Sequence, residues 1–287
     1  MAMEIKLEHI TADYVLGPIR SPLILKDVNL SIPSGSFTAI VGSTGAGKSS
    51  LLKVLNGLIL PRSGQVTIGD ITFHSGKDKQ ALRAIRKRVG MVFQFPESQL
   101  FAETVEKDIC FGPLNFGATR DQAKLIAERA IRQVKLDPAL LKKSPFSLSG
   151  GQKRRVAIAG VLAAEPEVLL LDEPCAGLDP AGQKELLSLL SQWNQGRGLT
   201  IILVTHDMES VAHFANSVVV MEKGKIVFHD DLHTLFSDTE QLTKWHLGLP
   251  EARRFQLELE RRSGIKLPHV CLTVDELTDA LIEVGLV

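Results

Sequence analysis

Residues 42–50 are Gly42-Ser43-Thr44-Gly45-Ala46-Gly47-Lys48-Ser49-Ser50, and they separate two stretches of different periodicity. The stretch before them, residues 37–41, is a short β-rich apolar run. The stretch after them, residues 51–58, repeats apolar residues at helical spacing. A strand, a glycine loop and a helix in this order form the setting in which G-x-x-x-x-G-K-[S/T] binds phosphate. The loop therefore predicts a nucleotide site at the end of a strand.

Each residue type in this loop has a role in holding a triphosphate. The glycines let successive backbone N–H groups, from Gly42 to Ser50, form a nest around the phosphates. Lys48 is expected to reach the β- and γ-phosphates, and the Ser49 hydroxyl to bind Mg²⁺. The alternative is a glycine-rich turn beside an ordinary surface lysine, and the flanking strand and helix argue against it.

Two carboxylates follow a second apolar run, residues 168–171. Asp172 at the strand end is expected to hold Mg²⁺ beside Ser49. Glu173 is the next residue, so its side chain should point elsewhere, where it can polarise an attacking water. A strand-terminal acidic turn is the alternative, and it fits poorly with a phosphate loop and a sheet that joins the two segments.

Two other polar residues come after predicted strands. Gln94 ends a strand that starts at Val89, where its amide could sense the metal ion and the water together; a solvated glutamine is the ordinary alternative. His206 follows the strand over residues 200–205 and precedes a helix capped by Asp207. Parallel-sheet geometry puts His206 on the same edge as Lys48. We therefore expect His206 to contact the γ-phosphate, with a purely structural histidine as the alternative.

A second glycine-containing stretch looks like half of a phosphate site. It is Leu148-Ser149-Gly150-Gly151-Gln152, and it stands before an apolar helical stripe. Free N–H groups at a helix N-terminus attract anions. The stretch lacks the rest of a nucleotide pocket, so on its own it should not hold a triphosphate.

The order of elements predicts an α/β fold of the P-loop NTPase type, with a parallel sheet wound with helices. Strands and turns over residues 4–75, with one strand at residues 30–32, add an antiparallel β-subdomain. A helix capped by Asp179 is expected over residues 180–195, and a hairpin is expected to turn at Lys223-Gly224. A helical insertion is expected over about 97–163, inside a main domain of residues 1–239. Short helices from 240 to 287 predict a C-terminal helical appendage, in which a Thr273-to-Glu276 capping box opens one helix.

Composition narrows the function classes. The 287 residues, 44% of them apolar, suffice for a real core. Lysine plus arginine and aspartate plus glutamate both total 33, so no net charge recruits nucleic acid. Cys110, Cys175 and Cys271 are scattered, which indicates a reducing cytosol. The apolar runs are short and residues 1–9 contain no signal-peptide core, so we expect a chain that neither crosses a membrane nor is secreted.

In their order along the chain these motifs resemble those of ABC-type ATPases. The matches to the Walker A, Q-loop, signature, Walker B, D-loop and H-loop motifs are Gly42–Ser49, Gln94, Leu148–Gln152, Val168–Glu173, Ala176–Asp179 and His206. The resemblance covers roughly residues 4–235 and implies ATP with Mg²⁺. It also implies a head-to-tail dimer, in which Ser149, Gly150 and Gly151 of one subunit close over ATP on the P-loop of the other. Tyr14, the only tyrosine, matches the family's adenine-stacking aromatic, with a plain strand aromatic as the alternative.

A narrower resemblance lies in the aromatic segment after Gln94. Residues 93–101 and 103–117 are similar to the ATPases of energy-coupling factor transporters, the vitamin and metal importers. Residues 95–97 and the Lys153-Arg154-Arg155 run are similar to the second of two paralogous ATPases in that group, and the C-terminal extension is similar to its dimer-stabilising appendage. Cys175 departs from the pattern, which usually has threonine there, and its oxidation is a possible consequence.

This resemblance implies an ATP-hydrolysing motor subunit, peripheral on the cytoplasmic side of the cell membrane. The implied partners are a second paralogous ATPase, a transmembrane coupling protein and a membrane-embedded substrate-binding protein. Five of the chain's twelve phenylalanines lie in residues 93–116. They either line a groove for helices of a membrane partner or build the core of the insertion, and the sequence leaves both open.

Three alternatives remain beside this interpretation. The chain could serve another importer family. It could be a soluble ABC switch in translation or DNA repair, which predicts two cassettes, a coiled coil or a zinc insertion, and none of these is visible. It could also be the degenerate member of an asymmetric pair, against which Lys48, Asp172, Glu173 and His206 argue. The transported solute and the choice between heterodimer and homodimer stay open.

Overall fold

The computed structural model describes residues 3–16, 19–20, 23–75 and 78–286. Its larger sheet has six strands in the order β12-β11-β5-β10-β9-β8, and only β12 runs antiparallel to its neighbour. The predicted parallel sheet is therefore confirmed, as is the hairpin that turns at Lys223-Gly224. The strands are β5 (Phe37–Val41), β8 (Val89–Val92), β9 (Val168–Asp172), β10 (Thr200–Val204), β11 (Ser217–Glu222) and β12 (Lys225–Asp230).

The smaller sheet is antiparallel, as the sequence predicted for the first 75 residues. It contains β4 (Leu25–Ile32), β1 (Ile5–Ala12), β6 (Ser63–Ile68) and β7 (Ile71–Phe73) in that spatial order, and β2 (Val15–Leu16) pairs separately with β3 (Ile19–Arg20). Strand β4 starts five residues before the expected run of residues 30–32. Leu25 and Val28 are buried in it, between exposed polar residues, and so extend its inward face.

Helices cover the larger sheet and shape its polar edge. They are α1 (Lys48–Leu55), α2 (Lys79–Arg88), α6 (Pro180–Arg197) and α7 (Met208–Phe214). Helix α6 begins as predicted, because the Asp179 carboxylate accepts a hydrogen bond from the Gly182 N–H at 2.8 Å and Pro180 occupies the first helical position. It ends at Gly198, whose φ of 65° is left-handed.

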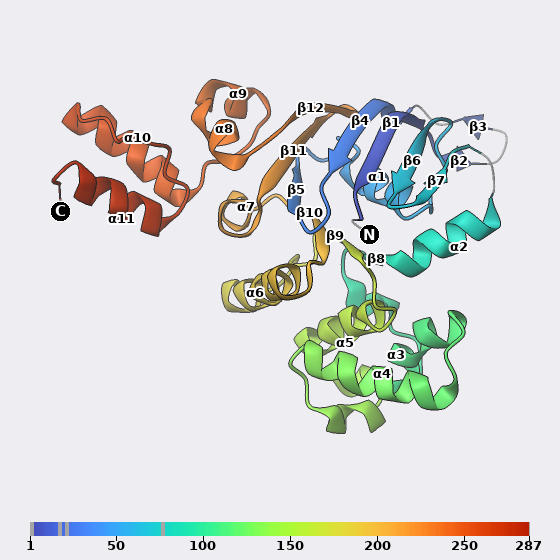
Figure 1. The fold of residues 1–287 in the computed structure, drawn as a ribbon. Helices are drawn as coiled ribbons and strands as arrows, with labels where there is room; N and C mark the ends of the chain where they lie inside the picture. Colours follow the sequence, from blue (N-terminus) through green and yellow to red (C-terminus); the bar gives the residue numbers. More distant parts are fainter. Residues whose placement is uncertain (1–2, 17–18, 21–22, 76–77, 287) are drawn as a thin grey trace.

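The segment between β8 and β9 forms a separate lobe, coloured green in Figure 1. Its helices are η1 (Pro96–Gln99), α3 (Val105–Asn115), α4 (Arg120–Gln133), η2 (Pro138–Lys142), η3 (Pro145–Ser147) and α5 (Gly150–Leu162). Their apolar side chains share one core with strand residues such as Leu169 and Leu171. The lobe is thus packed onto the end of the sheet that carries β8 and β9.

The C-terminal elements lie at the other end of the molecule, far from the green lobe in Figure 1. They are α8 (Leu232–Ser237), α9 (Thr239–Lys244), α10 (Glu251–Ser263) and α11 (Val274–Glu283). Helices α10 and α11 enclose a small core of their own, which includes Ala252, Cys271 and Leu277. No helix of the described residues is both long and apolar enough to span a membrane. The division at residue 239 into a main domain and an appendage stays a prediction.

The expected capping box of α11 is shifted by one residue. The Thr273 hydroxyl accepts from the Glu276 N–H at 3.2 Å, as expected, but the Glu276 carboxylate accepts from the Leu272 N–H at 2.7 Å and not from that of Thr273. The pattern T-x-x-E fixes the spacing of the two residues, whereas the rotamer of the glutamate decides which N–H it reaches.

Candidate functional site

The predicted site residues meet at the carboxyl edge of β5, β9 and β10. The loop that leaves β5 turns at Gly42, whose φ is 139°, and a Cβ there would lie 2.2 Å from the carbonyl oxygen of Met221. Gly47, with a φ of 105°, precedes the first residue of α1. Only glycine readily adopts the backbone conformation that both positions require. The loop therefore curves around a hollow before α1 begins.

This hollow is a cavity of about 480 Å³. Its lining brings together most residues that the sequence assigned to a nucleotide, from segments far apart in the chain. They are Tyr14, Ile24, Thr44, Gly45, Gly47, Lys48, Ser49, Ser50, Gln94, Glu173 and His206. Of these, Ile24 alone was not a candidate, because an apolar residue outside any recognisable motif gives no sequence signal of nucleotide binding. The roles of all these residues stay predictions.

Lys48 is buried at the floor of the loop, with 5% of its surface exposed. Its Nζ donates to the carbonyl oxygens of Gly42 at 2.7 Å and Ser43 at 3.0 Å. Burial lowers the pKa of this amine, and the nearby carboxylates of Glu173 and Asp172 act in the opposite direction. The ammonium group of Lys48 is therefore hydrogen-bonded to the backbone of its own loop.

Ser49 and Asp172 are in direct contact. The Ser49 Oγ donates to Asp172 Oδ1 at 3.0 Å, which joins the start of α1 to the end of β9. Burial raises the pKa of Asp172, while the bond from Ser49 opposes that shift. A hydroxyl and a carboxylate on adjacent elements are hard oxygen donors of the kind that Mg²⁺ accepts, with the remaining positions left to phosphate and water. This donor set fits Mg²⁺.

Glu173 follows the last residue of β9 and contacts two other candidates, whereas Asp172 contacts Ser49. Its Oε1 is 2.6 Å from His206 Nε2, and its Oε2 accepts from Gln94 Nε2 at 3.4 Å. The residue has a left-handed backbone with φ 48°, held by a bond from its N–H to the Val204 carbonyl at 3.0 Å. A strained non-glycine backbone of this kind is typical of functional positions.

Tyr14 lies at the mouth of the cavity. Its hydroxyl is 3.1 Å from Ser50 Oγ, and the Lys53 amine is 5.8 Å from the centre of its ring. The ring thus lines the cavity from the short link between β1 and β2, next to the start of α1. Stacking of this ring on adenine stays a prediction.

The Ser149-Gln152 stretch does not join this cavity. It forms the N-terminus of α5, where the Ser149 hydroxyl accepts from the Gln152 N–H at 3.3 Å and the Gln152 side chain accepts from the Ser149 N–H at 3.0 Å. A Cβ on Gly150 or Gly151 would meet nothing within 4 Å. Packing within this chain therefore gives no reason for either glycine.

Arg154 is a buried residue whose role the sequence did not reveal. Its guanidinium donates twice to the Glu97 carboxylate, at 2.8 and 3.0 Å, and once to the Pro174 carbonyl at 3.1 Å. These bonds join α5 to the segment after Gln94 and to the residue after Glu173. One signal was available, because Arg154 shares a helix face with Ile158 and Leu162, where an apolar residue is expected.

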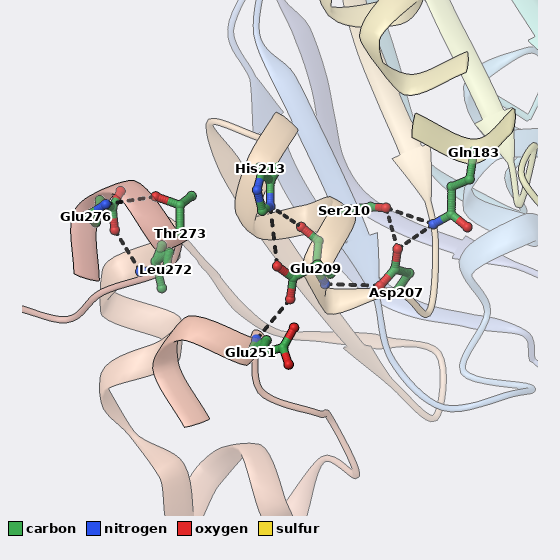
Figure 2. Close-up of polar contacts among 9 residues, drawn as sticks. All are labelled: Gln183, Asp207, Glu209, Ser210, His213, Glu251, Leu272, Thr273 and Glu276. Carbon is green, nitrogen blue, oxygen red and sulfur yellow. Dashed lines mark hydrogen bonds and ion pairs between the residues drawn. The ribbon is translucent and has the colours of Figure 1, made fainter. Parts of the chain in front are cut away.

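The helix after His206 is fixed to α6. Asp207 caps α7 by accepting from the Glu209 N–H at 3.1 Å, as predicted, and it also accepts from the Gln183 amide and the Ser210 hydroxyl (Figure 2). Nearby, burial raises the pKa of the Cys175 thiol to about 11. A raised pKa lowers the thiolate fraction at neutral pH and so disfavours oxidation at Cys175.

Three phenylalanines of the segment 93–116 are exposed: Phe95 at 46%, Phe101 at 61% and Phe111 at 52%. The rings of Phe101 and Phe111 meet edge to face, with centroids 5.0 Å apart. Leu114, on the same helix as Phe111, is also exposed. A core role is wrong for these three rings, whereas Phe93 and Phe116 are half-buried. We call Phe101, Phe111 and Leu114 the aromatic patch.

Comparisons with known proteins agree with this geometry. The sequence profile of a family described as ABC transporter matches residues 25–176. The chain is 49% identical over 276 residues to "Energy-coupling factor transporter ATP-binding protein EcfA2" of Listeria monocytogenes serovar 1/2a, which covers 96% of each chain. It is 48% identical over 282 residues to the protein of the same name from Bacillus cereus, across 98% of this chain and 96% of that one.

A solved structure extends the likeness to the fold. The cbiO1 protein from Clostridium perfringens, part of the ABC transporter complex cbiONQ, is 34% identical and superposes with a TM-score of 0.74. The match covers 91% of this chain and 98% of that chain. The match therefore extends past the phosphate loop to almost the whole chain.

Proposed function

This chain belongs to the ABC transporter family of ATP-binding proteins, and from that premise we propose that it is the ATP-hydrolysing subunit of an energy-coupling factor importer. The observation that carries the proposal is the cavity in which the P-loop meets the Gln94-Glu173-His206 group, with Ser49 of its lining bonded to Asp172. The similarity to EcfA2 proteins, at 48–49% identity over nearly the whole chain, supports the energy-coupling factor subtype. Vitamins or metal ions are the proposed class of solute.

The phosphate loop binds the triphosphate. The loop N–H groups face the phosphates, and Lys48 turns from the carbonyls of Gly42 and Ser43 toward the β- and γ-phosphates. Ser49 and Asp172 would hold Mg²⁺, with Gln94 near enough to sense it, and a bound Mg²⁺ supplies charge neutralisation for phosphoryl transfer. Tyr14 stacks on the adenine.

Hydrolysis depends on Glu173 and His206. Glu173 orients the attacking water and takes its proton, and His206 supports the γ-phosphate. The 2.6 Å contact between these two side chains supports these roles, because it places the carboxylate and the imidazole on one side of the cavity. Catalysis then consists of positioning and charge stabilisation.

A second subunit completes the site. Gly150 and Gly151 have open space above them, which supports close approach by another molecule at the N-terminus of α5. Ser149, Gly150, Gly151 and Gln152 therefore close over ATP bound to a partner's P-loop, and the partner is a second, paralogous ATPase. A related ATP-binding cassette, MJ0796, at 31% identity and TM-score 0.70, is dimeric and bound to ADP and Pi.

The membrane partners dock on the helical lobe. The aromatic patch supports this placement, since exposed apolar clusters mark interaction surfaces. A transmembrane coupling protein contacts the patch, a membrane-embedded substrate-binding protein selects the solute, and this chain lies peripherally on the cytoplasmic side of the cell membrane.

Purification from the native membrane tests the proposal. The tagged full chain is extracted in mild detergent, and co-purifying proteins are identified by mass spectrometry. Recovery of a paralogous ATPase with two membrane proteins is the expected result. Recovery of the chain alone, or with ribosomes or DNA, would overturn the importer assignment and favour a soluble switch.

A further inference from the structure

The N-terminus of α10 is capped by a side chain from another helix. Its own cap residue, Pro250, contributes no side-chain acceptor. The first N–H of the helix, that of Glu251, donates instead to Glu209 Oε2 at 2.9 Å, across 42 residues of sequence (Figure 2). Among the described residues no other side chain accepts a bond from the first turn of α10. Glu209 thus supplies the negative charge that a helix N-terminus favours.

Glu209 belongs to α7, the helix that begins next to the candidate nucleotide cavity. His206 lines that cavity and contacts Glu173, and Asp207 immediately follows it as the cap of α7. The Glu209 N–H donates to that cap at 3.1 Å. One helical turn therefore connects the residue that faces the γ-phosphate position to the carboxylate that holds α10.

The side chain of Glu209 is also contacted by His213 of the same helix. His213, one turn later in α7, has its Nδ1 3.1 Å from the Glu209 carbonyl oxygen and 3.6 Å from Glu209 Oε1. Figure 2 shows the imidazole and the Glu251 N–H on the same carboxylate. Glu209 is fixed to α7, so a displacement of α7 displaces the cap.

Among the described residues, the other hydrogen bonds and ion pairs that leave the α10-α11 pair reach α8, which does not line the nucleotide cavity. Arg253 Nε donates to the Phe236 carbonyl at 3.1 Å, and His233 Nε2 lies 3.5 Å from the Glu276 carboxylate. Met208 and Val211 of α7 share a core with Leu235 and Phe236 of α8. Leu272, between α10 and α11, lies in the same core, but among the polar links only Glu209 lies on the helix that starts at the cavity edge.

We propose that Glu209 is a positioning residue that couples the nucleotide state sensed by His206 to the orientation of the α10-α11 pair. The inference rests on the proposed function, because it requires ATP in the cavity. When His206 exchanges Glu173 for the γ-phosphate, the first turn of α7 shifts and takes Glu209 and the start of α10 with it. Coupling of this kind is reciprocal, so restraint of α10-α11 changes ATP affinity in turn.

Hydrogen exchange of the full chain tests the coupling. Exchange of a peptide covering residues 251–263 is measured by mass spectrometry, with and without a non-hydrolysable ATP analogue and Mg²⁺. Glu209→Ala should raise first-turn exchange by roughly fivefold, the factor that corresponds to a typical lost cap. It should also remove the analogue-dependent change at α10, and Glu209→Gln, which keeps an acceptor oxygen, should restore it in part.

Two measurements separate the possible results. Glu240→Ala is the matched control, since Glu240 is an exposed first-turn glutamate of neighbouring α9 without a side-chain bond. Binding of a fluorescent ATP analogue is measured in each form, so that exchange is compared at saturating analogue, and equal oligomeric state is checked by native mass spectrometry. Analogue binding without any change at α10, or the same change in Glu209→Ala, overturns this inference alone. A natural chain that binds no ATP overturns the proposed function and this inference with it.

Discussion

Glu173 combines a left-handed backbone with a carboxylate that lines the candidate nucleotide cavity. It accepts from Gln94 and contacts His206, and both partners come from other elements. A left-handed glutamate costs on the order of 1 kcal/mol, which the surrounding bonds must offset. The sequence predicted which residues gather here, because strand ends in a parallel sheet share one edge.

Glu173→Gln should retain ATP binding and lose turnover. The amide keeps the shape of the side chain but cannot take a proton, so we expect a loss of kcat of about 10²-fold or more. Phosphate release and binding of a fluorescent ATP analogue measure the two effects. Glu222→Gln, at the end of β11 and outside the cavity lining, is the control and should be unaffected. Normal hydrolysis in Glu173→Gln would remove the assignment of the base.

Arg154→Met should destabilise the chain by about 3 kcal/mol at pH 7, because it leaves the partly buried Glu97 without its counter-charge. Urea unfolding of the full chain measures the change. Arg155→Met is the neighbouring control: Arg155 pairs with the more exposed Glu185, so its loss should cost about 1 kcal/mol or less. Equal losses in the two variants would contradict the role of Arg154.

The pair of Arg154 and Glu97 also predicts how the stability of the chain depends on pH. Burial alone would raise the pKa of Glu97, but the hydrogen bonds and charge of Arg154 outweigh it and the pKa is lowered. The folded chain therefore keeps this charge to lower pH than the unfolded chain does. The contribution of this ion pair to the free energy of unfolding is complete above the ordinary glutamate pKa of about 4.3. It is lost as the pH falls through the lowered pKa of Glu97 in the folded chain. The stability gap between Arg154→Met and the natural chain should narrow accordingly below pH 4 or so.

At the scale of elements, local periodicity predicted the strand-loop-helix unit, α6 and α7 with their caps, and both sheets. It predicted a helical insertion but gave no bounds for α3, where Gly112 and Pro113 have poor helix propensity. Burial of Val105, Ile109 and Cys110 in the lobe core overrides that propensity. Arg154 was missed for a related reason, since its partner Glu97 lies 57 residues away and burial of a charge depends on such long-range pairs.

The N-terminus of α5 offers a test in which folding is not affected. Gly151→Arg should not destabilise the fold, since a Cβ there meets nothing within 4 Å. It should block closure over a partner's ATP and reduce hydrolysis by the assembled pair by about tenfold or more, with ATP binding at Lys48 retained. Gly160→Ala, in the same helix and equally open, is the control. Full hydrolysis in Gly151→Arg would exclude this stretch from the composite site.

At the scale of the whole molecule, the two lobes that flank the sheet face different proposed partners. The helical lobe presents the aromatic patch, and the C-terminal helices lie at the opposite end (Figure 1). Periodicity could not predict the exposure of Phe101 and Phe111, since this exposure depends on how α3 packs against α4 and α5. It also could not predict at which end of the molecule the C-terminal helices lie. The narrower family resemblance indicated a membrane partner but left the role of each ring open.

Phe101→Ser with Phe111→Ser should weaken capture of the membrane proteins while leaving the basal ATPase rate of the isolated chain within about twofold. Loss of two exposed aromatic anchors typically costs an interface 2 kcal/mol or more, roughly a thirtyfold weaker affinity. Co-purification in mild detergent measures the effect. Leu125→Ser is the control, an exposed leucine on α4 of the same lobe. Undiminished capture would place the membrane contact elsewhere.

The inward-folded amine of Lys48 has one consequence for the chain when no nucleotide is present. Because the amine already bonds to Gly42 and Ser43, an empty loop contains no orphaned ammonium and stays ordered without a ligand. The same two bonds compete with every arriving phosphate, and displacing a charge-assisted bond costs about 1.5 kcal/mol or more, close to tenfold in affinity. If Lys48 binds phosphate as proposed, we expect these bonds to lower the affinity for ADP as well as for ATP, and thereby to favour release of the spent nucleotide before the next one binds.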